Sequence, residues 1–409
     1  MWNFGVAKEV LAVSARGCHF KLASPAHIFN IRVSNVKTLA HLTFMASALF
    51  SALTAARSAH AEGNFWDLGY GVTASGSSAN GSVIGAYTEN GSYFMWTAAT
   101  GVTSIGGAWE GGRASVSADG TRISGSALGK DGLNHAGYYS VSTRQWNTLN
   151  GIGGNTGTSA SSSWNISGDG KTVVGLGWVD GGVAHATASN AGGSLLDLGS
   201  LGGSSRANGV SYDGSIIAGW VEQPYGNWTG VYWQDGTMHN LVDDQGNPHQ
   251  EATAVSADGR WIVGAGDFNQ AWRYNTLTQK TEWLGDLDAM GDYQGATGIS
   301  ADGQIIVGYD RDLGPAGSAH GFIWIEGQGM LNFTDYIIGQ GVDLGDRTLA
   351  LPLGVSADGR TFYGMDSAGS GFVVTVSPVP EPATYALIAA GLGLLTLRRR
   401  VFRCAAIKQ

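Results

Sequence analysis

Val255-Ser-Ala-Asp-Gly-Arg-Trp-Ile-Val-Gly264 is one copy of a phrase that recurs along the middle of this 409-residue chain. Each copy has an aliphatic residue and serine, one spacer, Asp-Gly, two or three β-forming residues and a final glycine. Further copies begin at Val116, Ile166, Val210, Ile299 and Val355, and a degenerate first copy with Asn-Gly spans Ser78 to Gly85. The seven Asp-Gly or Asn-Gly positions, 80, 119, 169, 213, 258, 302 and 358, are separated by 39, 50, 44, 45, 44 and 56 residues. The chain therefore contains a sevenfold internal repeat.

Two other β-rich pieces accompany each copy of the phrase. One is aromatic, as in Tyr93-Phe-Met-Trp96, and the other is a Leu-Gly phrase, as in Trp66-Asp-Leu-Gly69, with weaker forms at Ser104-Ile-Gly106 and Leu331-Asn-Phe333. Together with the segments on either side of Asp-Gly, they predict about four short strands per repeat, bounded by glycine turns. Four strands in a repeat of this length are typical of a propeller blade.

The turn chemistry and the order of the pieces predict how the repeats assemble. Asp-Gly suits a hairpin tip, because glycine accepts a positive φ and aspartate bonds to nearby amides. A Leu-Gly phrase precedes the first repeat and none follows Gly371-Phe-Val-Val374 in the last, so strands from the two ends are expected to pair and close a ring. The sequence predicts an all-β fold, a seven-bladed β-propeller over residues 62–376. An open β-solenoid is the structural alternative.

The N-terminal part, residues 1–61, has the features of a secretory leader. An apolar stretch runs from Leu39 to Ala56, after the basic residues Arg32 and Lys37 and before Ala59-His-Ala61. This order predicts a signal peptide with a small-x-small cleavage site formed by Ala59 and Ala61. A buried helix at the start of a globular domain is the alternative.

The C-terminal part, residues 377–409, resembles the PEP-CTERM sorting signal of Gram-negative bacteria. It contains Pro380-Glu381-Pro382, an apolar stretch to Leu397 and the cluster Arg398-Arg399-Arg400. The resemblance implies recognition of Pro380, Glu381 and Pro382 by an exosortase, a short transmembrane helix, and Arg398, Arg399 and Arg400 as its stop signal on the cytoplasmic side. It also implies passage through the inner membrane to the cell surface or the extracellular space, together with exopolysaccharide production. An ordinary tail-anchor helix is the alternative.

The repeats themselves resemble HAF repeats, named for a His-Ala-Phe phrase beside a tryptophan. His135-Ala-Gly-Tyr138, Ala184-His-Ala186 and His320-Gly-Phe-Ile-Trp324 match this phrase in part, and the other repeats lack the histidine. The resemblance covers residues 65–376 and implies an extracellular protein.

Charge and cysteine content exclude several kinds of site. The chain has 23 basic and 32 acidic residues; residues 1–61 hold 6 and 1, and residues 377–409 hold 5 and 1, which leaves 12 and 30, or a net charge of −18, for residues 62–376. So acidic a domain repels nucleic acid. Cys18 and Cys404 lie outside it, so it contains no disulfide and no thiolate metal site. His135, His185 and His320 fall in different repeats and predict no shared metal site, and no cofactor motif is present.

No constellation in the sequence identifies a catalytic centre. The sequence favours a non-enzymatic cell-surface or matrix protein that binds exopolysaccharide or another surface protein. Non-repeating aromatic residues are candidates for sugar stacking, with packing between blades as the alternative: Trp109, Trp164, Trp178, Tyr225 and Trp228. The functional alternative is a secreted glycosidase or lyase that uses non-repeating acids, for which the candidates are Glu110, Glu222, Glu251 and Asp310.

Overall fold

The computed structural model describes a large β-domain and one separate pair of strands. The β-domain covers residues 63–376, except 90, 110, 191–192, 268–269, 288–292 and 312–318. The separate pair, which the sequence did not predict, is an antiparallel hairpin of β1 (His19–Ser24) and β2 (His27–Arg32). The apolar stretch, Ala59, Ala61 and the whole C-terminal signal lie outside the described residues.

The strands of the β-domain form six antiparallel sheets. In chain order, the first four sheets are β4 (Val72–Ser77), β5 (Ile84–Thr88), β6 (Ser92–Thr97) and β7 (Gly101–Gly106); β8 (Arg122–Leu128), β9 (Asn134–Ser140) and β10 (Gln145–Thr148); β11 (Ser161–Ile166), β12 (Val173–Val179), β13 (Val183–Ser189) and β14 (Leu195–Asp197); and β15 (Ser205–Val210), β16 (Ile216–Glu222), β17 (Trp228–Gln234) and β18 (Thr237–Asn240). In the second sheet, the segment before β8 pairs only through the bridge between Val116 and Ile123.

The fifth sheet has eight strands, and the sixth joins the two ends of the domain. The fifth contains β19 (Glu251–Val255), β20 (Trp261–Asp267), β21 (Gln270–Asn275), β22 (Lys280–Trp283), β23 (Tyr293–Ile299), β24 (Ile305–Arg311), β25 (Ala319–Ile325) and β26 (Gly329–Asn332). It consists of two four-stranded meanders joined through the residue pair Ala265 and Gly295. The sixth contains β27 (Leu351–Val355), β28 (Thr361–Met365), β29 (Ser370–Thr375) and β3 (Asn64–Tyr70).

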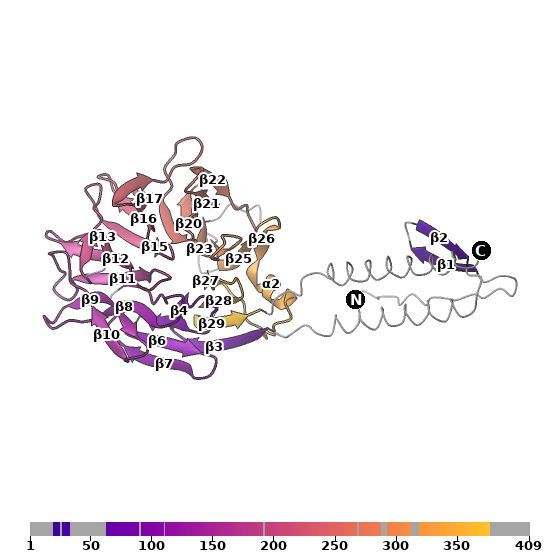
Figure 1. Ribbon diagram of the computed structural model, residues 1–409, viewed down its shortest axis with the longest axis horizontal. Helices are drawn as coiled ribbons and strands as arrows, with labels where there is room; N and C mark the ends of the chain where they lie inside the picture. Colours follow the sequence, from indigo (N-terminus) through magenta and orange to yellow (C-terminus); the bar gives the residue numbers. More distant parts are fainter. Residues whose placement is uncertain are drawn as a thin grey trace, which may run out of the picture. The chain divides into compact units, whose positions relative to one another are not determined.

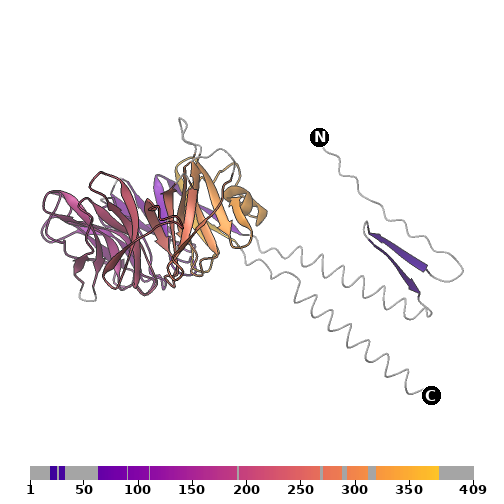
Figure 2. The same cartoon turned by 90° about the horizontal axis from the view of Figure 1, so that it is seen from above.

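The sheets are arranged around a common centre, as in a β-propeller. Figure 1 shows β4, β23 and β27 near the middle, whereas β7, β22 and β26 lie at the periphery. Turned by 90°, the domain is a disc that is wider than it is thick (Figure 2). An all-β propeller fold, as predicted, is therefore observed.

The ring is closed by strands from opposite ends of the domain, which confirms the predicted pairing. Strand β3 pairs with β29, and Asn64 lies opposite Thr375 while Tyr70 lies opposite Ser370. Outside this ladder, Arg347 forms ion pairs with Asp67 of β3 and with Asp366. Because this ladder joins the first and last strands of the domain, the edges of β3 and β29 that face one another are paired.

The hydrophobic core is divided into clusters between neighbouring sheets. One cluster joins Val174 and Ala186 of the third sheet to Val210 and Trp233 of the fourth. Another joins Leu68 and Val373 of the closing sheet to Ala74, Ile84 and Trp96 of the first. Each sheet is thus stabilised by burial against its neighbours.

One short helix departs from the sequence interpretation. Leu331-Asn-Phe333 was expected to be a strand, but β26 ends at Asn332 and α2 (Phe333–Gly339) begins there. The side chain of Asn332 accepts a hydrogen bond from the Asp335 amide at 3.1 Å, so it caps the helix. Phe333 and Ile337, one turn apart, are both buried against the sixth sheet.

Candidate functional site

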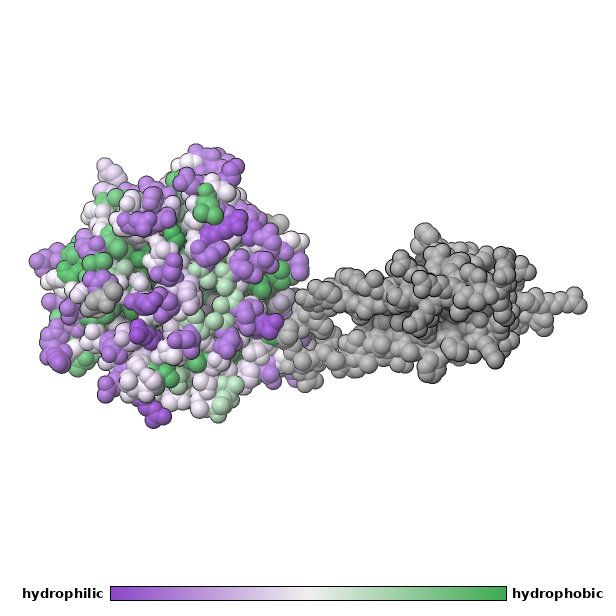
Figure 3. All heavy atoms as spheres, viewed as in Figure 1, coloured by the Kyte–Doolittle hydropathy of each residue, from purple (hydrophilic) through white to green (hydrophobic). Residues whose placement is uncertain are grey.

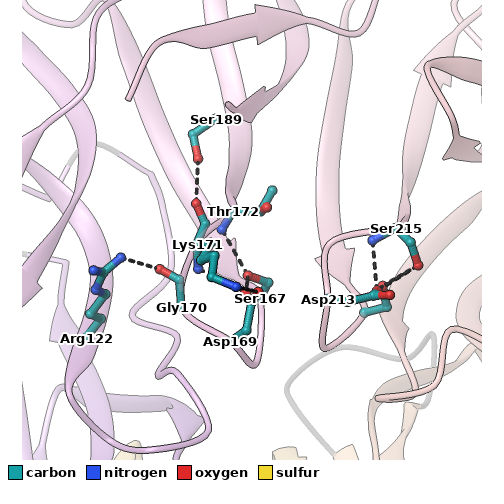
Figure 4. Close-up of polar contacts among 10 residues, drawn as sticks. Arg122, Ser167, Asp169, Gly170, Lys171, Thr172, Ser189, Asp213 and Ser215 are labelled. Carbon is teal, nitrogen blue, oxygen red and sulfur yellow. Dashed lines mark hydrogen bonds and ion pairs between the residues drawn. The ribbon is translucent and has the colours of Figure 1, made fainter. Parts of the chain in front are cut away.

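The Ser-x-Asp-Gly turns join the first two strands of each repeat, and they share one hydrogen-bond pattern. In Figure 4, the Ser167 hydroxyl donates to Asp169 Oδ1 at 2.7 Å and accepts from the Thr172 amide at 2.9 Å. The Lys171 ammonium pairs with Asp169, and Arg122 of the preceding sheet donates to the Gly170 carbonyl at 2.6 Å. The turn glycines have φ between 68° and 80°, namely Gly81, Gly120, Gly170, Gly214, Gly259, Gly303 and Gly359. The acids at these tips therefore stabilise turns.

Removal of one turn serine should change both a pKa and the stability. The Ser117 hydroxyl, followed by the Thr121 amide, holds the pKa of Asp119 below its ordinary value. In Ser117→Ala that pKa should rise, and the free energy of unfolding at pH 7 should fall by about 1 to 3 kcal/mol because the Arg122 amide loses its acceptor. The folded-state pKa is lowered, so the hydrogen bonds of ionised Asp119 stabilise the fold above the unfolded pKa of about 4. This contribution to the free energy of unfolding is lost as the pH falls through the folded-state pKa.

Carboxyl NMR titration and urea unfolding at pH 7 and pH 3 measure these effects. Ser104→Ala, at an exposed position of β7, is the control. An unchanged pKa of Asp119 in Ser117→Ala would contradict the assigned hydrogen bond.

Backbone hydrogen bonds join several neighbouring turns to one another. The Ala79 amide donates to the Ala118 carbonyl at 2.9 Å, and the Tyr212 amide donates to the Ala257 carbonyl at 2.9 Å. The Asp358 amide donates to the Ala79 carbonyl at 3.2 Å, which joins the last turn to the first. The spacers all line one cavity, the central channel, and are small except for Tyr212: Ala79, Ala118, Gly168, Tyr212, Ala257, Ala301 and Ala357.

The innermost strands carry β-bulges whose polar side chains bridge to the next sheet. The pairing of β19 with β20 shifts between Ala252 and Ala254, and the bulged Thr253 donates through Oγ1 to the Ala296 carbonyl at 2.6 Å. Thr297 donates in the same way to the Pro352 carbonyl at 2.6 Å. The sequence reasoning missed these bridges, although their signal is present three residues before the repeat serine.

The channel is a cavity of about 180 Å³ lined by the innermost strands. Its walls include Ser75 and Ser77 of β4, Trp164 and Asn165 of β11, Thr253 of β19, Thr297 of β23 and Leu353 of β27. Arg113, just before the second sheet, also lines it. Sequence reasoning did not single out Arg113, but a signal existed: the residues four positions before the repeat serine are otherwise small or uncharged, namely Ala74, Ser163, Ala207, Ala252, Ala296 and Pro352.

A series of cations and indole rings extends outward from the channel. The Arg206 guanidinium lies 3.7 Å from the Trp164 ring centroid and 5.2 Å from that of Trp220. Trp220 stacks on Trp228 with centroids 4.2 Å apart and an interplanar angle of 6°. Burial lowers the pKa of Arg206 to about 10, although its ion pair with Glu251 at 2.8 Å opposes that shift. Arg206 therefore stays charged at neutral pH.

The candidate acids are dispersed rather than gathered. Glu251 pairs with Arg206 and also accepts from Asn208 at 2.9 Å. Glu222 Oε2 accepts from the Ser204 amide at 3.0 Å, and Asp310 accepts from Gln294 at 3.0 Å. Glu110 lies outside the described residues. The three described acids thus hold neighbouring segments together in the geometry observed.

The candidate aromatic residues divide into packed and exposed members. Trp109 stacks on Tyr87 at 5.4 Å and donates to the Gly112 carbonyl, and Trp164 and Trp178 are half-buried. Tyr225 and Trp228, on and beside the β16–β17 loop, are 94% and 44% exposed. Only these last two present an aromatic surface to a large ligand.

The three histidines occupy separate surroundings. His135 contacts Asp131 at 3.0 Å, whereas His320 is exposed. His185 Nδ1 lies 2.8 Å from Asp197, and its Nε2 lies 3.2 Å from the Ser200 hydroxyl. Asp197 also accepts from the Gly199 amide, as Asp67 of β3 does from the Gly69 amide. The Asp-Leu-Gly part of this Ser-His-Asp arrangement is therefore a repeated turn.

Two features are absent from the described part of the chain. No group of three or more His, Cys, Asp or Glu side chains there is placed to hold a metal ion. No helix there combines the length and the apolar character needed to cross a membrane.

The C-terminal residues match a known sorting motif. The family model of the PEP-CTERM protein-sorting motif matches residues 378–401. This motif marks an exported protein that is sorted to the cell surface and processed by an exosortase. It includes Pro380, Glu381, Pro382, Arg398, Arg399 and Arg400, all outside the described residues.

Three solved structures are similar to this chain. An oligogalacturonate lyase in complex with manganese is 14% identical, with a TM-score of 0.50 over 77% of this chain and 93% of that chain. A putative TolB from Agrobacterium tumefaciens is 15% identical (TM-score 0.44; 76% of this chain, 91% of that chain), and TolB from Acinetobacter baumannii is 12% identical (TM-score 0.41; 86% and 72%). No curated protein matches the sequence. At these identities the likeness to the lyase concerns the fold alone.

Proposed function

We propose that this exported protein is a non-enzymatic, seven-bladed scaffold at the cell surface or in the extracellular matrix, where it binds exopolysaccharide or another surface protein. The blade count follows if the eight-stranded sheet is divided at the pair Ala265 and Gly295 into two blades. In this proposal the repeats of residues 65–376 are HAF repeats. Residues 383–397 hold the chain in the inner membrane until the exosortase acts.

The observation that carries the binding role is the exposed aromatic surface at the β16–β17 loop. Trp228 lies flat on Trp220, which is itself 7% exposed, so the outer indole is held in a fixed orientation. Tyr225, on the same loop, is 94% exposed. A supported, solvent-facing indole presents apolar area with little conformational freedom to lose, as stacking on a sugar ring requires.

Tyr70 and Tyr212 are also exposed, at 85% and 51%, but neither stacks on another aromatic ring among the described residues. Figure 3 shows hydrophobic residues as small groups among hydrophilic ones on the face it draws. Such a mixed surface is typical of a protein that stays in solution, and isolated apolar residues need no partner.

Substitution of Trp228 tests the binding role. We expect Trp228→Ala to weaken binding to exopolysaccharide of the producing cell by about fivefold, because an aromatic contact contributes about 1 kcal/mol beyond its buried area. Sedimentation of protein with the polymer measures the effect. Leu277→Ala, which truncates a 77% exposed side chain on the β21–β22 turn, is the control. Equal retention of both variants would contradict a role for the aromatic surface.

Catalysis is the second candidate function, favoured by the Asp197, His185 and Ser200 arrangement. A serine hydroxyl beside a histidine that is oriented by a carboxylate is the arrangement of a hydrolytic nucleophile. If the protein shortened or de-esterified the polymer, and if Ser200→Ala or Glu251→Gln abolished that reaction, the non-enzymatic proposal would be wrong.

A further inference from the structure

The channel differs in charge from the domain that surrounds it. Residues 62–376 carry 12 basic and 30 acidic residues, as counted above. Among the described residues that line the channel there is no Asp, Glu or Lys, and Arg113 is the one charged side chain. A single guanidinium in a confined space without carboxylates is an anion site by charge.

The guanidinium of Arg113 takes part in no ion pair among the described residues. Its backbone amide donates to the Ser163 carbonyl at 3.0 Å, and its side chain lies 5.5 Å from the Trp164 ring centroid. In contrast, the nearby Arg206 forms an ion pair with Glu251 and donates a hydrogen bond to Asn208. The two guanidiniums beside Trp164 and the carboxylate paired with Arg206 therefore sum to a net charge of +1.

A second residue of the cavity wall carries a buried donor. The buried Trp164 Nε1–H has no hydrogen-bond partner among the described residues. A buried donor without an acceptor costs about 1 to 3 kcal/mol, a cost that an acceptor bound in the cavity would remove. A ligand oxygen would therefore satisfy the Trp164 donor, and a ligand carboxylate would balance the charge of Arg113.

Neighbouring tyrosines do not neutralise the charge of Arg113. Burial raises the pKa of Tyr363, which also lines the channel, to about 12, although the charge of Arg113 opposes the shift. Burial likewise raises the pKa of Tyr309 to about 12 and that of Tyr87 above its ordinary value. All three phenols are neutral at physiological pH and supply no counter-charge.

The size of the cavity limits what it can hold. A cavity of about 150 Å³ holds a benzene ring, so the channel, at about 180 Å³, has room for one six-membered ring. Its walls carry Ser75, Ser77, Ser115 and Thr253 beside the aliphatic side chains of Val116 and Val255. Such a lining fits a polyhydroxylated ring better than a purely apolar one.

We propose that the channel binds a sugar acid of one ring, a hexuronate, with its carboxylate on the Arg113 guanidinium and a ring oxygen or hydroxyl on the Trp164 indole N–H. Planar guanidinium groups bind carboxylates through two parallel hydrogen bonds, which a neutral sugar cannot form. The site lies inside the ring and does not require the Trp228 surface, so the two proposals can fail separately.

Calorimetric titration of the full chain with matched sugars tests the site. We expect glucuronate to bind and glucose to bind at least tenfold more weakly, because only the acid carries the carboxylate. Arg113→Gln should weaken glucuronate binding at least tenfold and leave glucose unchanged. Arg113→Lys should retain part of the affinity, since charge persists without the two-pronged geometry. Arg360→Gln removes the same charge from an exposed turn and should bind like the original chain.

Two further readouts place the ligand and identify its source. The indole N–H signal of Trp164, assigned by its absence in Trp164→Phe, should shift with glucuronate and not with glucose. Acetate that competed with glucuronate at equal concentration would show that any small carboxylate suffices, which would overturn the sugar-acid assignment. Thermal unfolding first establishes that the original chain and Arg113→Gln are both folded. Equal affinity of these two proteins for glucuronate would overturn the site itself, as would equal affinity of the original chain for glucose and glucuronate.

Discussion

Deletion of residues 63–70 should abolish cooperative folding of the ring. The deletion removes β3, whose ladder with β29 joins the two ends of the domain. It also removes Leu68 and Trp66 from the cluster that packs the closing sheet on the first, and the Asp67 partner of Arg347. Truncation of one buried leucine costs about 2 to 5 kcal/mol, so loss of the whole strand should exceed about 5 kcal/mol, a large part of the stability of an ordinary domain.

Urea unfolding followed by tryptophan fluorescence measures the effect of this deletion. A synthetic peptide of residues 63–70 should restore part of the lost stability by adding back the missing strand. An unfolding midpoint that is the same with and without residues 63–70 would show that β3 does not close the ring.

The second large effect is expected from a single methyl group. Gly219, the final glycine of its repeat phrase, faces the strand beside it, and a Cβ atom there would lie 1.9 Å from the Arg206 carbonyl oxygen. The same close approach recurs at Gly175, Gly308 and Gly364, each with a backbone oxygen at 2.1 Å. Gly219→Ala must therefore separate β15 from β16 and should lower the free energy of unfolding by about 3 kcal/mol.

Gly339→Ala is the matched control for this substitution. A Cβ atom at Gly339, the last residue of α2, meets no atom within 4 Å. Its free energy of unfolding should stay level or rise by about 0.5 to 1 kcal/mol, because alanine restricts the unfolded chain. Equal stability of Gly219→Ala and the original chain would contradict the close contact between β15 and β16.

The sequence predicted the parts of the fold that repeat. The Asp-Gly period indicated the turns, and the displaced Leu-Gly phrase indicated that β3 would pair with β29, because turn chemistry and strand order are local properties of the text. The sequence also marked the final glycine of each phrase, but only the structure shows why it is needed at Gly219. Gly219 pairs with Ala207, beside the register shift between Ala207 and Gly209, and the distance between the two backbones at that point is a property of the folded sheet.

The parts that do not repeat were harder to predict. Arg113, Arg206 and Glu251 lie in different repeats and meet only when the innermost strands surround the channel. Glu251 was a candidate catalytic acid on sequence grounds, but its partner Arg206 is 45 residues away in the chain. The helix α2 was missed because Phe333 followed a strand-like phrase, and its asparagine cap outweighed that local pattern.

A cross-link between the first and last strands of the β-domain tests ring closure most directly. The Asn64 and Thr375 positions face one another across the β3–β29 ladder, 311 residues apart in the chain. Opposed residues of antiparallel strands lie within disulfide range, and residues 62–376 contain no cysteine of their own. In a chain with Cys18 and Cys404 replaced by serine, Asn64→Cys with Thr375→Cys should oxidise to an intramolecular disulfide, whereas Asn64→Cys with Gln145→Cys should not. Failure of the first pair to cross-link in the folded protein would contradict a closed ring.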